Sequence, residues 1–220
     1  MKKYNLVYSI IVVIAISLFI TTLSVNIVAR SSTVYSFYFN DSSAVNNVYT
    51  TLSNSQMADK LAGFMNAWKP DKFEITEDTG YDQFNIFTDE EGYNMMRVKY
   101  YVDISMILCV ISFIIAGAIY YLFIKNDMKK TLRTCYRVSM GTTMVMVILE
   151  MIILQSNKGR LWVESLLGMK KLAEDSQLSA MLGSEFVTMA AGFLIIVSVI
   201  VFLLASYVSY RLTKPQRIFY

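Results

Sequence analysis

Four long apolar runs alternate with polar stretches along the chain. They cover about residues 6–27, 101–124, 138–155 and 186–210. Each run is near or above the roughly 17 to 25 residues that a helix needs to cross the hydrocarbon core of a membrane. The pattern therefore predicts an all-α membrane protein, a four-transmembrane-helix bundle in a single integral membrane domain over residues 1–220.

The polar stretch between the first two runs carries shorter patterns. Ser53 and Gln56 form a capping box, and the apolar residues after them recur with the spacing of an amphipathic helix that ends before Pro70. Residues 73–88 contain two short strand-like runs around a turn at residues 77–80, which predicts a hairpin. The chain should therefore carry a small extracytoplasmic α+β cap, made of this helix and this hairpin.

Residues 31–49 are polar and aromatic, without a clear period. Val34, Phe37, Tyr38 and Phe39 within them would suit the headgroup region of a membrane. A helix and a hairpin alone are too small to enclose a core, so we expect the cap to rest on the membrane bundle.

The second span has a polar beginning. Thr88 and Glu91 form another capping box, at the start of a helix that continues to Ile124. At a rise of 1.5 Å per residue, about three turns of this helix would stand above the membrane. We call residues 91–101 the collar, because acidic, basic and aromatic side chains gather there, and we expect any function at this place.

The stretch between the third and fourth spans, residues 156–185, is also amphipathic. Residues 159–172 alternate leucine and tryptophan with charged side chains, a pattern typical of a helix lying in the membrane interface. Residues 176–182 form a second short amphipathic piece, which Gly183 and Ser184 end just before the last span.

Charge is distributed unevenly around the spans, although the net charge is only +3. Ten basic residues and one acid flank the spans at the two termini and in the loop 125–137, whereas residues 28–100 carry six basic and ten acidic residues. Because loops rich in Lys and Arg stay in the cytoplasm, we expect both termini, the loop 125–137 and residues 211–220 to be cytoplasmic. Residues 28–100 and 156–185 would then be extracytoplasmic, in a protein of the cell membrane.

Composition excludes several kinds of chemistry. The chain has no histidine, so Ser-His or Cys-His dyads and histidine metal sites are absent, as is the usual proton shuttle near neutral pH. Cys109 falls inside a predicted span and Cys135 in the cytoplasmic loop, which leaves no pair for a disulfide. We therefore expect no metal and no cofactor, and nothing in the charge pattern indicates a nucleic-acid partner.

Two acidic residues fall within the spans. Glu150 lies about two-thirds of the way through the third span, where a carboxylate costs at least ~2.5 kcal/mol. It is either a proton or substrate site or a residue that fixes helix packing. Asp103 lies about one turn into the second span and should meet water. Pairs of small residues such as Ser139 and Thr143 should let helices approach closely.

The order and spacing of several motifs resemble those of a family of bacterial four-span membrane proteins, described by a domain of unknown function, that includes lipoprotein intramolecular transacylase. That family has an acidic residue, then a histidine-methionine pair, then a valine-lysine pair entering the second span. Here Glu91, Asn94-Met95 and Val98-Lys99 match that spacing. The resemblance covers the architecture of the whole chain.

The chain departs from the family pattern at both histidines. Asn94 stands at the first, and Val163, after Trp162, stands at the second. A later leucine-proline to phenylalanine motif would fall on Leu182-Gly183 and Phe186. The resemblance implies the fold. Because it assigns acyl transfer to the two histidines, their absence from this chain puts the activity in doubt.

These observations lead to three hypotheses. The first is a non-catalytic relative with a cleft at the outer leaflet for a membrane lipid or a lipoprotein. Its lining would come from the collar and the opposite loop: Glu91, Asn94, Arg97, Lys99, Trp162 and Glu164. The second is an active lipid or lipoprotein acyltransferase with a carboxylate base, for which Glu91, Asn94 and Glu164 are the candidate catalytic residues. The third is a carrier or channel subunit that uses Glu150.

Overall fold

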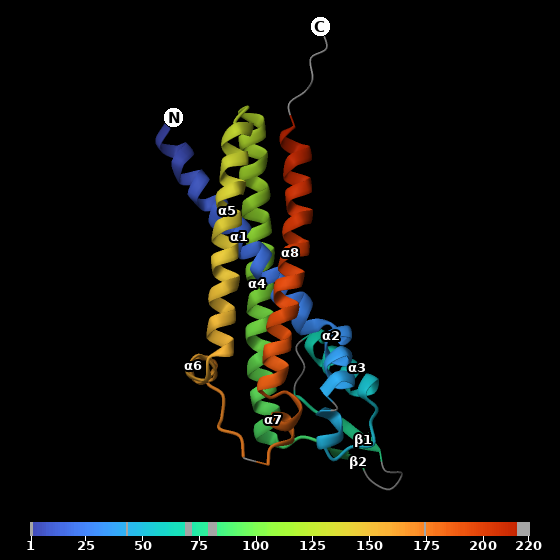
Figure 1. The fold of residues 1–220 in the computed structure, drawn as a ribbon. Helices are drawn as coiled ribbons and strands as arrows, with labels where there is room; N and C mark the ends of the chain where they lie inside the picture. The colour runs from blue at the N-terminus through green and yellow to red at the C-terminus, as the bar shows by residue number, and fades with distance from the viewer. Residues whose placement is uncertain (1, 43, 69–71, 79–82, 174, 215–220) are drawn as a thin grey trace. The chain divides into compact units, whose positions relative to one another are not determined.

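The computed structural model of the chain describes residues 2–42, 44–68, 72–78, 83–173 and 175–214 (Figure 1). The elements of the described residues are, in chain order, α1 (Lys2–Arg30), α2 (Ser32–Ser42), the 3-10 helix η1 (Ala44–Asn47), α3 (Asn54–Asn66), β1 (Thr76–Asp78), β2 (Gln83–Asn85), α4 (Asp89–Lys125), α5 (Lys129–Gln155), α6 (Asn157–Leu167), α7 (Gln177–Met181) and α8 (Ser184–Thr213).

Within these residues, four helices are long and apolar enough to cross a membrane, namely α1, α4, α5 and α8. They contain the four apolar runs of the sequence, and the all-α four-span fold with a small α+β part is confirmed. The lengths of the shortest and longest, 27 residues for α5 and 37 for α4, exceed the roughly 20 residues that a span needs.

The chain folds into two compact units, which share these long helices. The helical unit consists of residues 2–25, 105–150 and 195–214, and the mixed unit consists of residues 26–104 and 151–194.

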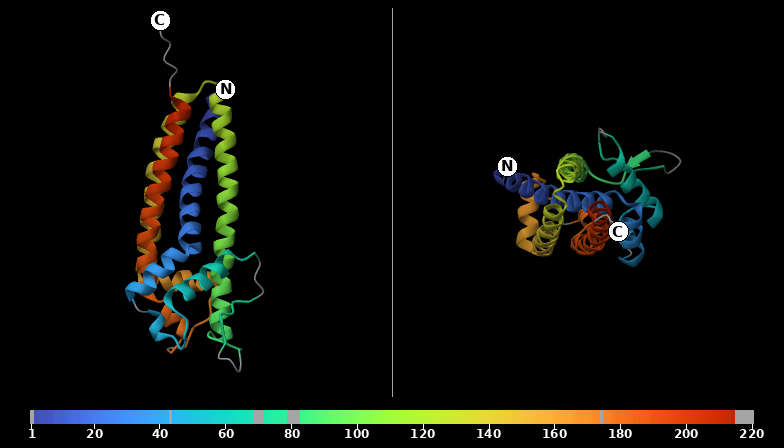
Figure 2. Two further views of the ribbon diagram at one scale, coloured as in Figure 1. Left: turned by 90° about the vertical axis from the view of Figure 1, so that its right-hand side faces the viewer. Right: turned by 90° about the horizontal axis from the view of Figure 1, so that it is seen from above.

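In the helical unit, α1 lies between α4 on one side and α5 and α8 on the other (Figure 2). Its core contains apolar side chains from all four helices: Val12, Ile16, Ile20, Ile119, Phe123, Leu132, Cys135, Tyr136 and Val201. The expected close approach at small residues occurs between α1 and α5. The Ser17 hydroxyl lies 2.5 Å from the Thr142 hydroxyl and donates to the Ser139 carbonyl at 3.2 Å. Ser139 and Thr143 are buried, as packing positions should be.

A tight turn joins α4 to α5. Asp127 adopts a φ of 55°, a left-handed conformation that aspartate tolerates better than most residues. The turn brings α4 and α5 together as antiparallel neighbours. The start of α1, this turn and the end of α8 lie at the same end of the helical unit (Figure 1).

The mixed unit has a hydrophobic core, to which the predicted helix and hairpin contribute only a part, as their small size requires. The core holds 18 buried hydrophobic residues, which come from α2, η1, α3, the hairpin segment, α4 and α7. The expectation did not include α2, which forms within residues 31–49, where the sequence shows no clear hydrophobic period. Val34, Tyr38 and Phe39 are buried here and do not form a headgroup belt, whereas Phe37 is 56% exposed.

Aromatic packing explains why α2 folds despite its polar composition. The Tyr35 ring stacks on Phe186 of α8, with centroids 5.6 Å apart, and the Tyr38 ring meets the same side chain edge-on at 5.3 Å. Burial raises the pKa of Tyr35 to about 12, because its ionised form would lose its hydration. The helix is therefore stabilised by residues distant in sequence, which a local pattern does not reveal.

The amphipathic helix and the hairpin are confirmed. The capping box of Ser53 and Gln56 starts α3, which ends at Asn66. The strands β1 and β2 are antiparallel, with Thr76 opposite Asn85 and Glu77 opposite Phe84. Glu77 and Asp78, expected in the turn, belong to β1; Thr79, Gly80, Lys69 and Pro70 lie outside the described residues.

The buried carboxylate of Glu77 explains why the first strand includes residues that were expected in the turn. Glu77 accepts hydrogen bonds from the Thr51 hydroxyl, from the Thr51 backbone N–H at 2.8 Å and from the Thr50 hydroxyl at 3.0 Å. These bonds, the one from the Thr51 hydroxyl first, hold the pKa of Glu77 below its ordinary value. The strand is therefore fixed to the segment that precedes α3.

Candidate functional site

The collar lies at the start of α4, in the mixed unit, and its first residue joins two helices. Glu91 forms the predicted capping box: its carboxylate accepts from the Thr88 N–H at 2.8 Å and from the Thr88 hydroxyl at 3.0 Å. The other carboxylate oxygen accepts from the Ser176 hydroxyl at 2.6 Å and from the Leu178 N–H at 2.8 Å. Glu91 is 2% exposed, so a buried carboxylate caps α4 and holds the first turn of α7.

Asn94 is equally buried, at 1% exposure, and both ends of its amide are bonded to one residue. Its amide nitrogen donates to the Lys170 carbonyl at 2.8 Å, and its amide oxygen accepts from the Lys170 N–H at 2.7 Å. The side chain thus completes the hydrogen bonding of an irregular backbone segment. It ties α4 to the chain that follows α6.

Lys99 belongs to a charged network that closes the end of α3. Its ammonium group donates to the Met65 carbonyl at 3.0 Å and lies 3.4 Å from the Asp103 carboxylate. Arg30 donates to the same carbonyl at 2.5 Å and to Asp103 at 2.5 Å. A carbonyl in the last turn of a helix has no partner within the helix and carries partial negative charge. Two cations satisfy it here, and Asp103 balances their charge.

Arg97 differs from these buried groups, because it is only half-buried and lies against an aromatic ring. Its guanidinium donates twice to the Tyr93 hydroxyl, at 2.9 and 2.7 Å, and its central carbon lies 5.2 Å from the Tyr93 ring centroid. The ammonium of Lys170 also lies over this ring, at 5.0 Å. Tyr93, Arg97 and Lys170 form what we call the Tyr93 patch.

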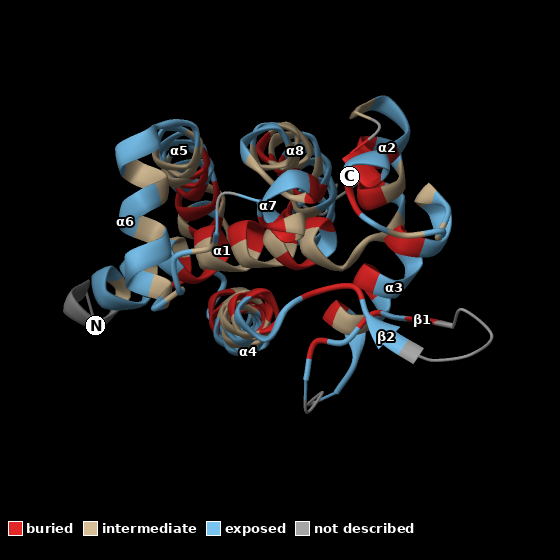
Figure 3. Cartoon of the chain, turned by 90° about the horizontal axis from the view of Figure 1, so that it is seen from below, coloured by how far each residue is buried: buried red, intermediate tan, exposed pale blue. Residues whose placement is uncertain are grey.

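Trp162 and Glu164 lie on α6, which has no buried residue (Figure 3). Trp162 is 60% exposed, and Glu164 is exposed. Within the described residues, no hydrogen bond or ion pair joins either side chain to the collar. The contact with α4 comes instead from the end of α6, where the Tyr101 hydroxyl donates to the Leu166 carbonyl at 3.3 Å. Gly168 ends this helix with a φ of 66°, a left-handed conformation that suits glycine.

Two surface cavities are lined by residues outside the collar. One, in the helical unit, has a volume of about 140 Å³ and lies between α5 and α8. The other, in the mixed unit, has a volume of about 350 Å³ and is lined by Gln155, Arg160, Ser184, Glu185, Thr188 and Met189. Thr188 is exposed at this second cavity.

Glu150 lies in the helical unit, on the same face of α5 as the buried Ser139, Thr143 and Val147. Its Oε2 atom is buried and has no hydrogen-bond partner among the described residues. The Ser198 hydroxyl of α8 is in the same situation. The buried Oε2 atom therefore gains no hydrogen bond within the described residues, and it gives no support to the packing role considered for Glu150.

Sequence reasoning missed three contributors to the collar region. Arg30 was not singled out. Asp103 was expected to meet water, which agrees with its 43% exposed side chain, but its pairing with Arg30 and Lys99 was not expected. Ser176, which donates to Glu91, was seen only as the start of a short amphipathic piece. One signal was available: Arg30 follows an apolar run at the end predicted to be extracytoplasmic, where a basic residue needs a partner.

Comparison with known proteins gives matches at the level of structure alone. No model of a protein family matches the sequence, and no curated protein matches it. The membrane-integral lipoprotein intramolecular transacylase Lit from Bacillus cereus matches with a TM-score of 0.75 and 15% identity, over 100% of both chains. Its variants with one histidine changed to alanine or arginine match with TM-scores of 0.77 and 14% identity, over 99% of this chain. The chain therefore has the fold of this multi-pass membrane protein.

Proposed function

We propose that the chain is a membrane protein that binds a lipid or a lipoprotein at the Tyr93 patch and does not transfer acyl groups. The observation that supports this is a difference in burial between the other polar side chains of the collar and the cations of the Tyr93 patch. Glu91, Asn94 and Lys99 are buried and bonded within the chain. Arg97 is half-buried and Lys170 is exposed, and two cations around an aromatic ring suit an anionic headgroup or peptide.

Acyl transfer needs a group that accepts a proton near neutral pH and returns it to the leaving group, a function usually worth about 10² to 10⁴ in rate. Asn94 and Val163 stand at the positions where the resemblance places histidines, and neither can carry a proton in this range. Glu91 already accepts four hydrogen bonds from its own chain. Glu164 lies on the exposed helix α6, and no hydrogen bond or ion pair in the described part of the chain joins its side chain to the collar.

The test uses cells that lack lipoprotein transacylase and express this chain, with two readouts. Mass spectrometry of lipoprotein N-termini should show no acyl-shifted form. An acyl-shifted form that disappears with Glu91→Gln or Glu164→Gln would instead establish the carboxylate-based acyltransferase.

The second readout is binding. A photo-crosslinking amino acid in place of Tyr100, which is 56% exposed near the Tyr93 patch, should capture lipidated molecules labelled with an alkyne fatty acid. The double substitution Arg97→Gln, Lys170→Gln should lower this yield several-fold. The matched control places the crosslinker at Trp68, which is 91% exposed. Equal capture from both positions would contradict binding at the patch.

The orientation of the protein is part of the proposal. Both termini are assigned to the cytoplasm, because the basic residues gather at the two termini and the α4–α5 turn. Trp68→Cys and Lys170→Cys should react with a membrane-impermeant thiol reagent in intact cells, and Lys130→Cys should not. Background labelling should be low, since Cys109 and Cys135 are buried. Labelling at residue 130 alone would reverse the orientation.

A carrier function is the second candidate, supported by the unpartnered Oε2 atom of Glu150. If Glu150 has no transport role, Glu150→Gln removes a charge that costs at least ~2.5 kcal/mol in a span, and thermal unfolding in detergent should be unchanged or shifted upward. The control is Gln155→Glu at the end of the same helix. A folded Glu150→Gln protein that has lost proton-dependent uptake in vesicles would favour the carrier.

A further inference from the structure

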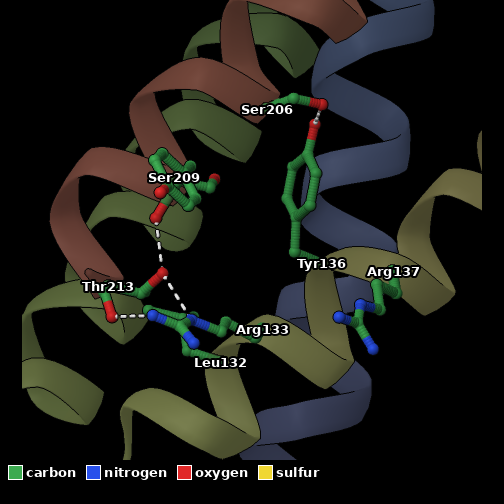
Figure 4. Close-up of a pocket in the computed structure, with 8 residues that line it drawn as sticks. Leu132, Arg133, Tyr136, Arg137, Ser206, Ser209 and Thr213 are labelled. Carbon is green, nitrogen blue, oxygen red and sulfur yellow. Dashed lines mark hydrogen bonds between the residues drawn. The ribbon is translucent and has the colours of Figure 1, made fainter. Parts of the chain in front are cut away.

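The cavity between α5 and α8 in the helical unit, which we call the α5–α8 cavity, is lined by hydroxyl groups and two arginines (Figure 4). Its volume of about 140 Å³ is roughly tenfold what a single water molecule needs. Arg133 and Arg137 come from one face of α5, and Ser206, Ser209 and Thr213 come from α8.

The two arginines have no carboxylate partner. Among the described residues, neither forms an ion pair, and no acidic residue lines the cavity. Residues four apart on a helix have neighbouring side chains, so two positive charges stand together here without neutralisation. This arrangement costs repulsion unless an anion offsets it.

Arg133 is held in place by α8. Its Nε donates to the Thr213 hydroxyl at 3.0 Å, and one of its terminal nitrogens donates to the Thr213 carbonyl at the end of the helix. Its other terminal nitrogen has no partner within the described residues. Arg137 is exposed and has no hydrogen bond there. A fixed arginine beside a free one resembles a prepared anion site more than a flexible basic surface.

Hydroxyl groups complete the lining. Tyr136 lies between the arginines in sequence, and its hydroxyl donates to the Phe202 carbonyl at 3.1 Å and pairs with the Ser206 hydroxyl at 2.8 Å (Figure 4). Hydroxyls can donate to an anion after rotating about one bond. The planar guanidinium group can donate two parallel hydrogen bonds to phosphate oxygens, and hydroxyls can donate to the remaining oxygens.

We infer that the α5–α8 cavity binds a phosphate group through Arg133 and Arg137. The group belongs to an anionic lipid or to a soluble phosphate, and both present the same oxygens. The site is independent of the Tyr93 patch, because it uses residues of the helical unit alone.

The test measures thermal unfolding of the purified full chain in detergent. Phosphatidylglycerol should raise the Tm by about 5 °C relative to phosphatidylcholine when it is far above its Kd. Arg137→Gln should remove at least half of this shift. Arg133→Lys should also weaken it, although the lysine keeps a positive charge beside the end of α8. The matched control is Arg211→Gln, which removes a charge from the same end of α8, where Arg211 bonds the Tyr207 hydroxyl at 3.0 Å outside the cavity.

Inorganic phosphate, added without lipid, separates the two sources. A shift with phosphatidylglycerol alone assigns a lipid headgroup. A shift with inorganic phosphate that Arg137→Gln abolishes supports the same site with a soluble ligand. Equal loss in Arg137→Gln and Arg211→Gln would overturn the inference, because general attraction to basic residues would then explain the shift. The absence of a shift with either ligand would also overturn it.

Discussion

Glu91→Gln should lower the stability of the chain by about 3 kcal/mol, a decrease of roughly 6–12 °C in Tm. The wild-type carboxylate accepts four hydrogen bonds, from Thr88, Ser176 and Leu178. The amide of glutamine turns a donor toward groups that are themselves donors, so at least one buried N–H or hydroxyl loses its partner. Thermal unfolding in detergent measures the change.

The matched control is Glu90→Gln, on the adjacent and exposed position of the same helix. This variant loses only a favourable interaction with the helix dipole, typically below about 1 kcal/mol. If both variants unfold at the wild-type temperature, Glu91 does not hold α4 and α7 together. Its carboxylate would then be free for chemistry, and the case against a carboxylate base would weaken.

Asp103→Ala should be the second large effect, a loss of about 2–3 kcal/mol. Removing one partner of a buried ion pair costs about 3–5 kcal/mol, and we reduce this range because the Asp103 side chain is 43% exposed. The variant leaves Lys99, which is 2% exposed, and Arg30 facing each other over one carbonyl. Adding Lys99→Met should recover part of the loss, because Arg30 can still donate to the Met65 carbonyl.

The comparison for this network is the pair of Lys72 and Glu74, which lie 3.9 Å apart with side chains 76% and 52% exposed. Glu74→Ala should change stability by less than about 1 kcal/mol, because exposed ion pairs contribute little. A similar loss in Glu74→Ala and Asp103→Ala would mean that burial does not strengthen the network around Lys99.

The collar shows how a motif can keep its spacing while its side chains hold structure. Glu91 and Asn94 fall where the resemblance expects functional residues, and both bond the chain between α6 and α7. An asparagine can bridge a backbone N–H and a carbonyl at once, which a proton-carrying base could not do while remaining free to react.

Local features of the sequence were enough for the spans and the helix starts. Apolar length predicts α1, α4, α5 and α8 because a membrane leaves backbone groups no partners outside a helix. The capping boxes at Ser53 and Thr88 were equally predictable, since donor and acceptor lie three residues apart.

The helix α2, the core of the mixed unit and the network of Arg30, Lys99 and Asp103 required the tertiary structure. Tyr35 meets Phe186, and Arg30 meets Asp103, across 151 and 73 positions of the chain. Such contacts depend on where distant segments pack, and no periodicity within a window of sequence encodes them. The same reason applies to the site: the sequence placed Glu91 and Asn94 on one helix, but only packing against residues 170–178 decided that they are buried and bonded.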